Sequence, residues 1–66
     1  MLMRESELFA RLREHLGDDY APAWAAQVGL AELNSRTVQE AVADGVDCKT
    51  IWRAAWQQLE LPAKYR

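Results

Sequence analysis

Apolar residues recur at helical spacing in the first quarter of the chain. They are Leu8, Phe9, Leu12 and Leu16. The four fall within one narrow arc of a helical wheel and Arg11 lies outside it, so the pattern predicts a helix from about Glu5 or Ser6 to Leu16. Because glycine adopts left-handed backbone without penalty, we expect Gly17 to end this helix.

A second helix is predicted directly after this stop. Asp18 or Asp19 is placed to cap its first turn, in which Pro22 is tolerated. The apolar residues beyond fall on two sides of one wheel, with Tyr20, Trp24, Val28 and Ala31 on one and Leu30 and Leu33 elsewhere. Because glycine costs about 1 kcal/mol relative to alanine inside a helix, we expect this helix to break near Gly29.

The third predicted helix is short and has a clear start and stop. Thr37 is followed three residues later by Glu40, which is the spacing of a capping box. The helix then runs from about Val38 to Ala43. Gly45 ends it, and Val46 is expected to pack back on its last turn.

The fourth predicted helix begins after Asp47, which caps it, and runs to about Leu59. Its apolar stripe comprises Cys48, Ile51, Trp52, Ala55 and Leu59. We expect Trp52 to fill the centre of the core. The sequence therefore predicts one all-α domain, residues 1–66, of four short helices, the last two forming a helix-turn-helix-like pair. Residues 1–4 and 63–66 are expected to fray.

The composition argues against several classes of protein. The chain has 66 residues, 50% of them hydrophobic and 27% charged, with a net charge of -2. An acidic balance disfavours general binding to nucleic acid or to anionic membranes. A single cysteine, Cys48, excludes an internal disulfide and fits a reducing, cytoplasmic setting. No stretch approaches the roughly 20 apolar residues of a membrane span.

Residues with catalytic chemistry are few and do not form a motif. Cys48 lies near a helix N-terminus, but His15 is the only histidine, and we interpret the thiol as buried and inert. His15 itself fits a capping or boundary position in the last turn of the first helix. No spacing of ligands suggests a metal site, and no glycine-rich loop suggests a phosphate-binding cofactor. We therefore expect no enzymatic activity, no metal and no cofactor.

The side chains chosen as a candidate interaction surface lie on the fourth predicted helix: Lys49, Arg53, Trp56 and Gln57. Trp56 lies at the rim of the apolar stripe, and tryptophan and arginine are enriched at protein interfaces. A local alternative is that Trp56 packs within the domain, with Arg53 stacked on it as a cation–π pair. A third possibility is that a partner binds the basic tail at residues 64–66.

DNA binding is the alternative from a different class. Ala41, Gly45, Ile51 and Ala54 follow the spacing of a helix-turn-helix. The fourth helix would then present Lys49, Thr50, Arg53 and Gln57 to the major groove. Two basic residues are few for a recognition helix, and the net charge counts against this interpretation.

One resemblance covers nearly the whole chain. It rests on Arg36-Thr37, Glu40-Ala41, Gly45-Val46, Ile51-Trp52-Arg53-Ala54 and Leu61-Pro62, together with Tyr20-Ala21 and Leu30 to Leu33. These residues resemble the small actinobacterial proteins catalogued as domain of unknown function 3046. The resemblance implies a compact cytoplasmic helical protein with no assigned activity, whose genes often lie near those of a recombinase and its regulator. The chain departs from the family at Asn34-Ser35, where glycines are usual, at Cys48, where proline is common, and at Trp56, where cysteine is frequent.

Overall fold

The computed structural model describes residues 3–65 and confirms the all-α class. Its helices are α1 (Glu5–Leu16), α2 (Tyr20–Gln27), α3 (Val38–Ala43) and α4 (Cys48–Gln58), with 3₁₀ helices η1 (Ala31–Leu33) and η2 (Ala63–Tyr65). Within that range no strand forms, and Leu30 and Arg36 make an isolated antiparallel bridge. The bounds of α1 and α3 match the predicted ones, and α4 ends one residue earlier than expected.

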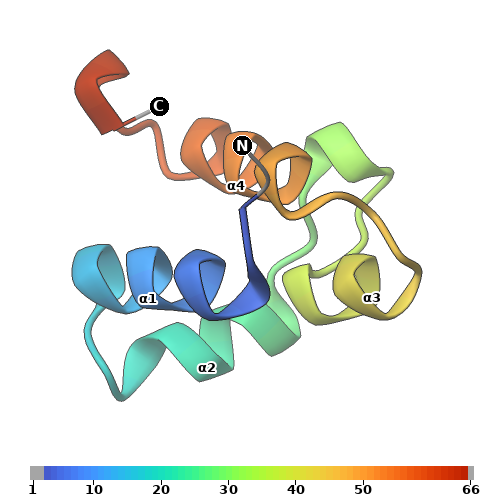
Figure 1. Ribbon diagram of the computed structural model, residues 1–66, viewed down its shortest axis with the longest axis horizontal. Coiled ribbons are helices and arrows are strands. Elements are labelled where there is room, and N and C mark those ends of the chain that lie inside the picture. The colour runs from blue at the N-terminus through green and yellow to red at the C-terminus, as the bar shows by residue number, and fades with distance from the viewer. Residues whose placement is uncertain (1–2, 66) are drawn as a thin grey trace.

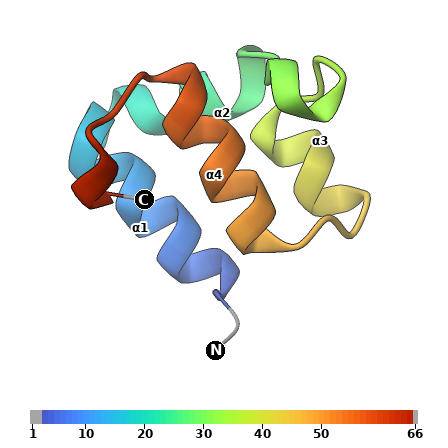
Figure 2. The same ribbon diagram turned by 90° about the horizontal axis from the view of Figure 1, so that it is seen from above.

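Helix α4 packs against three other elements. Seen from above, α4 lies between α1 and α3, and it contacts both of them as well as η1 (Figure 2). α2 runs beneath α1 and contacts α1 and α3 (Figure 1). The radius of gyration is 10.6 Å, close to the roughly 11 Å that a compact chain of this length has. Helix α4 is thus supported on several sides.

The core is apolar throughout. Its buried members are Leu8, Leu12, Ala21, Trp24, Ala25, Leu30, Leu33, Val38, Ala41, Ile51, Trp52, Ala54 and Ala55. Trp52 is the largest of them and is 1% exposed, which confirms its predicted place at the centre. No polar or charged side chain among the described residues is buried.

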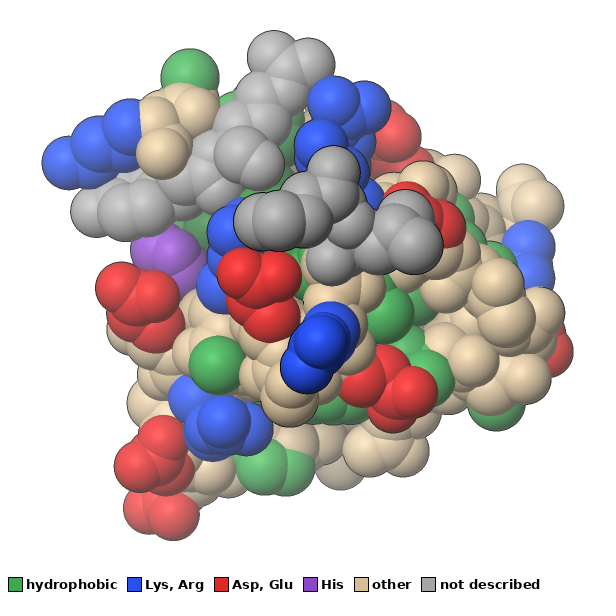
Figure 3. Space-filling model, in the orientation of Figure 1, with side chains coloured by type: hydrophobic (Ala, Val, Ile, Leu, Met, Phe, Trp, Pro, Cys, Tyr) green, Lys and Arg blue, Asp and Glu red, His purple; other side chains and the backbone are tan. Residues whose placement is uncertain are grey.

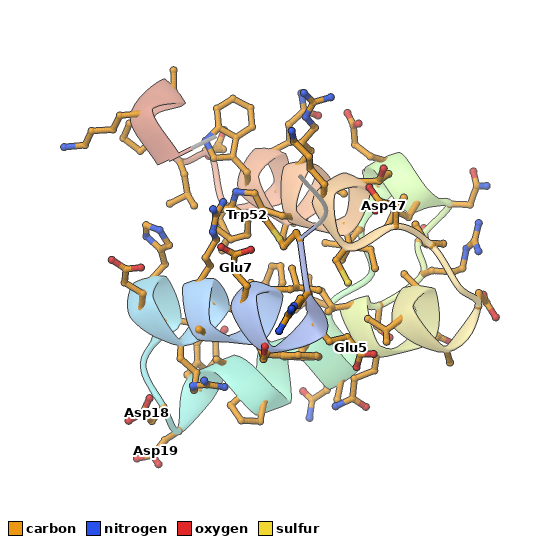
Figure 4. The ribbon with its side chains drawn as sticks, in the orientation of Figure 1. Glu5, Glu7, Asp18, Asp19, Asp47 and Trp52 are labelled. Carbon is orange, nitrogen blue, oxygen red and sulfur yellow. The ribbon has the colours of Figure 1, made fainter. Side chains whose placement is uncertain are left out.

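The start of α2 differs from the prediction. Asp19 precedes the helix, but its side chain does not make the expected cap hydrogen bond. Its backbone is already helical (φ -82°, ψ -37°), whereas a capping residue is extended. Pro22 has no N–H to offer, and the N–H of Ala21 donates to the Gly17 carbonyl at 3.0 Å. Asp18 and Asp19 point outward from the α1–α2 corner instead (Figure 4).

The predicted break near Gly29 is present, and its cause is a close approach of the backbone. α2 ends at Gln27, and a Cβ built on Gly29 would lie 2.5 Å from the Ser35 carbonyl oxygen. The chain then turns through left-handed backbone at Asn34 (φ 58°) and Ser35 (φ 66°). Left-handed backbone favours glycine, so both positions would accept glycine in place of Asn34 and Ser35.

The ends of α3 and the start of α4 follow the sequence closely. The capping box is complete, since Glu40 N–H donates to Thr37 Oγ1 at 3.1 Å and Thr37 N–H to Glu40 Oε1 at 2.9 Å. Gly45 has a φ of 81°, and the Val46 N–H donates to the Ala41 carbonyl at 3.0 Å. Asp47 caps α4 by accepting from the Thr50 N–H at 3.4 Å. The predicted turn between α3 and α4 is therefore confirmed.

The described range begins at Met3 and ends with η2. Met3 is half-buried and packs against the core, and residues 63–65 form η2, which the sequence did not predict. The fraying expected for 1–4 and 63–66 concerns motion and stays a prediction. Residues 1, 2 and 66 lie outside the described range.

Candidate interaction surface

The four residues predicted as an interaction surface lie on one side of α4, here called the outer face: Lys49, Arg53, Trp56 and Gln57. Residues spaced by three, four or seven positions share a side of a helix, so a straight α4 brings them together. Lys49, Arg53 and Gln57 are exposed, and Trp56 is half-buried. All four thus lie on α4 as expected, and their role as an interaction surface stays a prediction.

The two cations of the outer face differ from three arginines elsewhere on the molecule. Three arginines have a carboxylate nearby: Arg11–Glu7 at 3.7 Å, Arg13–Asp18 at 3.9 Å and Arg36–Asp44 at 3.1 Å. Within residues 3–65, Lys49 and Arg53 make no ion pair. They are four positions apart on the same helix, where like charges repel. The outer face therefore carries two positive charges that no ion pair neutralises within residues 3–65.

Trp56 is held in place by the segment that follows α4. Its indole Nε1–H donates to the Pro62 carbonyl oxygen at 2.9 Å. The Leu61 N–H donates to the Trp56 carbonyl at 3.1 Å, across a left-handed Glu60 (φ 55°). Trp56 thus packs within the domain, on this segment and against the core, but without the expected stacking of Arg53, and it remains half-buried at the edge of the outer face.

A second cluster, between α1 and α4, was not predicted. The Arg11 guanidinium carbon lies 5.5 Å from the centre of the Trp52 ring, and the His15 ring stacks on the same indole at 5.8 Å between centroids. Figure 4 shows Trp52 between the two helices, with Glu7 pointing from α1 toward α4. The described cation–π contact thus involves Trp52, not the suggested Arg53–Trp56 pair. The only sequence signal is the four-residue spacing of Glu7, Arg11 and His15 on one side of α1.

Cys48 lies in the first turn of α4 and is half-buried. Burial raises the pKa of its thiol above the ordinary value of 9.0, and the negative charges of Glu5 and Asp47 raise it further. A raised pKa keeps the sulfur protonated at neutral pH, and the thiolate is the nucleophilic form. This direction agrees with the interpretation of Cys48 as an inert thiol. The histidine of the chain, His15 on α1, stacks on the ring of Trp52, which lies one turn of α4 beyond Cys48.

Tyr20 forms a further exposed feature, at the opposite end of the molecule from the start of α4. It is 57% exposed, while Trp24 on the same predicted face is 5% exposed. The difference arises because Tyr20 is the first residue of α2, beside the outward-pointing Asp18 and Asp19. Across the view of Figure 3, acidic and basic side chains are interspersed.

Fold and surface together define a small all-helical protein with an apolar core and a charged exterior. No helix within residues 3–65 has the length and apolar character needed to cross a membrane. No group of three or more potential metal-ligating side chains is found in that range. The chain belongs to the family described as protein of unknown function (DUF3046), whose model matches residues 3–64. No curated protein and no solved structure matches it.

Proposed function

We propose that this protein is a small, non-enzymatic, cytoplasmic interaction module that binds another protein through the outer face of α4. The observation that supports this most is the pair Lys49 and Arg53, exposed and without an ion pair in residues 3–65. The pair lies beside the exposed edge of Trp56. Tryptophan and arginine are the residues that most often dominate binding energy at interfaces.

The packing of α4 also favours this role. The inner side of α4 carries Ile51, Trp52 and Ala55, which are buried against the neighbouring helices. A helix held in this way presents its outer side chains on a rigid support, so binding does not require ordering of the backbone. The outer face is thus ready for a partner without a change of fold.

Affinity capture from the native host tests this proposal. The bait is compared with the double variant Arg53→Glu, Trp56→Ala and with Arg13→Glu, which changes an exposed cation on α1. We expect the double variant to lose partners that the wild type and Arg13→Glu retain. Circular dichroism must show that the double variant is folded. If every captured protein remains bound to the double variant, the outer face is not the binding surface.

DNA binding through α4 is a second candidate, supported by one observation. α3 and α4 are joined by the compact turn at Gly45, and Lys49, Thr50, Arg53 and Gln57 are all exposed on α4. The net charge of -2 counts against it. Titration of a DNA duplex at increasing salt separates the two proposals. Phosphate contacts make affinity fall steeply with salt, and absence of binding at low salt removes this candidate.

A further inference from the structure

From the charges on the outer face we infer the chemistry of its partner: an acidic polypeptide segment that also carries an apolar side chain. This inference rests on the proposed function and specifies its partner. Carboxylates of the segment pair with Lys49 and Arg53, and its apolar side chain packs on the exposed edge of Trp56. The two kinds of contact lie side by side because all three residues share one side of α4.

The distribution of charge near Lys49 and Arg53 favours a partner with negative charge. Within α4 the exposed neighbours of this pair, Thr50 and Gln57, carry no charge, and the nearest carboxylates along the chain, Asp47 and Glu60, lie just beyond the two ends of the helix. The Asp47 carboxylate accepts from the N–H and the hydroxyl of Thr50. Two like charges one turn apart repel, and a bound carboxylate relieves that repulsion. An anionic partner is therefore favoured over a neutral or cationic one.

Trp56 contributes an indole ring to the outer face. Its only polar group, the indole N–H, already donates to the Pro62 carbonyl at 2.9 Å. The rest of the half-buried ring is apolar. A large apolar anchor beside a charged rim is the usual arrangement of a protein-binding surface. The partner's complementary group is thus an apolar side chain.

The overall charge of the chain favours a polypeptide over a nucleic acid as the partner. The chain has ten acidic residues and eight basic ones, and a duplex places phosphates along its whole length. Phosphates that extend beyond α4 would face the carboxylates of the other helices, and binding to DNA requires a broad positive surface. A short acidic segment needs only the local positive charge of Lys49 and Arg53.

The test uses the full chain and a synthetic peptide in which leucines recur at helical spacing and glutamates fill the other positions. Amide signals of the ¹⁵N-labelled protein are followed during titration at low and at high salt. We expect the largest shifts at residues 49–57 and weaker binding at high salt. A peptide with glutamine in place of glutamate is expected to bind at least about tenfold more weakly, as loss of charge pairing at about 1.4 kcal/mol implies.

Four variants locate the contact. Arg53→Glu is expected to weaken binding of the glutamate peptide about tenfold or more, since it reverses a charge at the contact. Arg13→Glu makes the same change of net charge on α1 and is expected to alter affinity less than about twofold. Trp56→Phe keeps an apolar ring without the N–H and should retain binding, whereas Trp56→Ala should lose it.

The inference is overturned if the glutamine peptide binds as tightly as the glutamate peptide, or if Arg13→Glu weakens binding as much as Arg53→Glu. It is also overturned if the shifts lie around Tyr20, or if a duplex binds the outer face and the peptide does not. Should the peptide fail while capture still depends on Arg53 and Trp56, only the acidic chemistry is wrong. Capture that ignores both residues contradicts the proposed function itself.

Discussion

Trp52 and Trp56 lie one turn apart on α4, and their surroundings differ. The Trp52 ring is 1% exposed, with Arg11 and His15 of α1 on it. The Trp56 ring is half-buried, and its N–H is bonded to Pro62, six residues along the chain. One tryptophan thus joins helices that are distant in sequence, while the other is fixed by its own C-terminal segment.

This difference shows how one helix divides into a structural and a binding side. A ring that fills the space between helices contributes most of its energy to folding. Trp56 also packs against the core, but it is half-buried and not enclosed between helices. We expect the two positions to respond in opposite ways, with Trp52 governing stability and Trp56 governing binding.

The largest expected effect is that of Trp52→Ala. Removing a buried aromatic ring costs about 3–5 kcal/mol of unfolding free energy, out of a typical total of about 5–15 kcal/mol. Urea unfolding followed by circular dichroism measures the loss. Trp56→Ala is the matched control and should cost clearly less. If the two variants were equally destabilised, the proposed division between the tryptophans would be wrong.

The next effect is that of Trp56→Phe, which keeps a ring but removes the donor to the Pro62 carbonyl. Loss of this hydrogen bond should lower the free energy of unfolding by about 0.5–1.5 kcal/mol. Amide exchange at Leu61 should become faster, because the same turn holds its N–H on the Trp56 carbonyl. Unchanged exchange there would show that the bond to Pro62 does not hold the segment.

A similar magnitude with the opposite sign is expected for Glu60→Gly, at the turn that follows α4. Left-handed backbone costs a residue with a side chain about 1–2 kcal/mol, while added glycine freedom in the unfolded chain takes back about 0.4–1 kcal/mol. We expect a net gain of about 0.5–1 kcal/mol in thermal or urea unfolding. The matched control is Gly45→Ala, at the equivalent turn after α3. No atom lies within 4 Å of a Cβ there, so its expected loss reflects the backbone alone.

The smallest effect on stability is expected for Arg53→Glu. An exposed side chain without an ion pair in residues 3–65 should change the free energy of unfolding by less than about 0.5 kcal/mol. Arg11→Glu should cost more, because it removes the cation from the Trp52 ring and places a second carboxylate beside Glu7. Parallel urea unfolding curves measure both. A larger loss at Arg53 than at Arg11 would assign Arg53 to the fold rather than to a binding surface.

Local features of the fold could be predicted from the sequence because neighbouring residues produce them. The capping box at Thr37 and Glu40 and the stop at Gly45 depend on hydrogen bonds within a few positions. The grouping of Lys49, Arg53, Trp56 and Gln57 follows from helical spacing alone. The predicted cap at Asp19 did not form, although aspartate is a suitable capping residue. Pro22 has no N–H to donate, and the Gly17 carbonyl already accepts the N–H of the residue before Pro22.

Contacts between elements could not be predicted in the same way. Arg11 lies outside the apolar arc of α1, yet its guanidinium lies over Trp52 because α1 and α4 pack side by side. Trp56 was assigned to the rim, but the sequence did not show that Pro62 returns to accept its N–H. Both contacts depend on where separate elements meet, and the hydropathy pattern of one helix carries no such information.

The sequence by itself therefore determined the number of α-helices, most of their ends, and which side of α4 is apolar. Helical periodicity, caps and glycine turns are local, so their physics acts between residues a few positions apart. Only the tertiary structure decided that Trp52 is covered by Arg11 and His15, and that Lys49 and Arg53 have no carboxylate partner within residues 3–65. Burial and ion pairing depend on what the rest of the chain places next to a residue, which is settled when the helices pack.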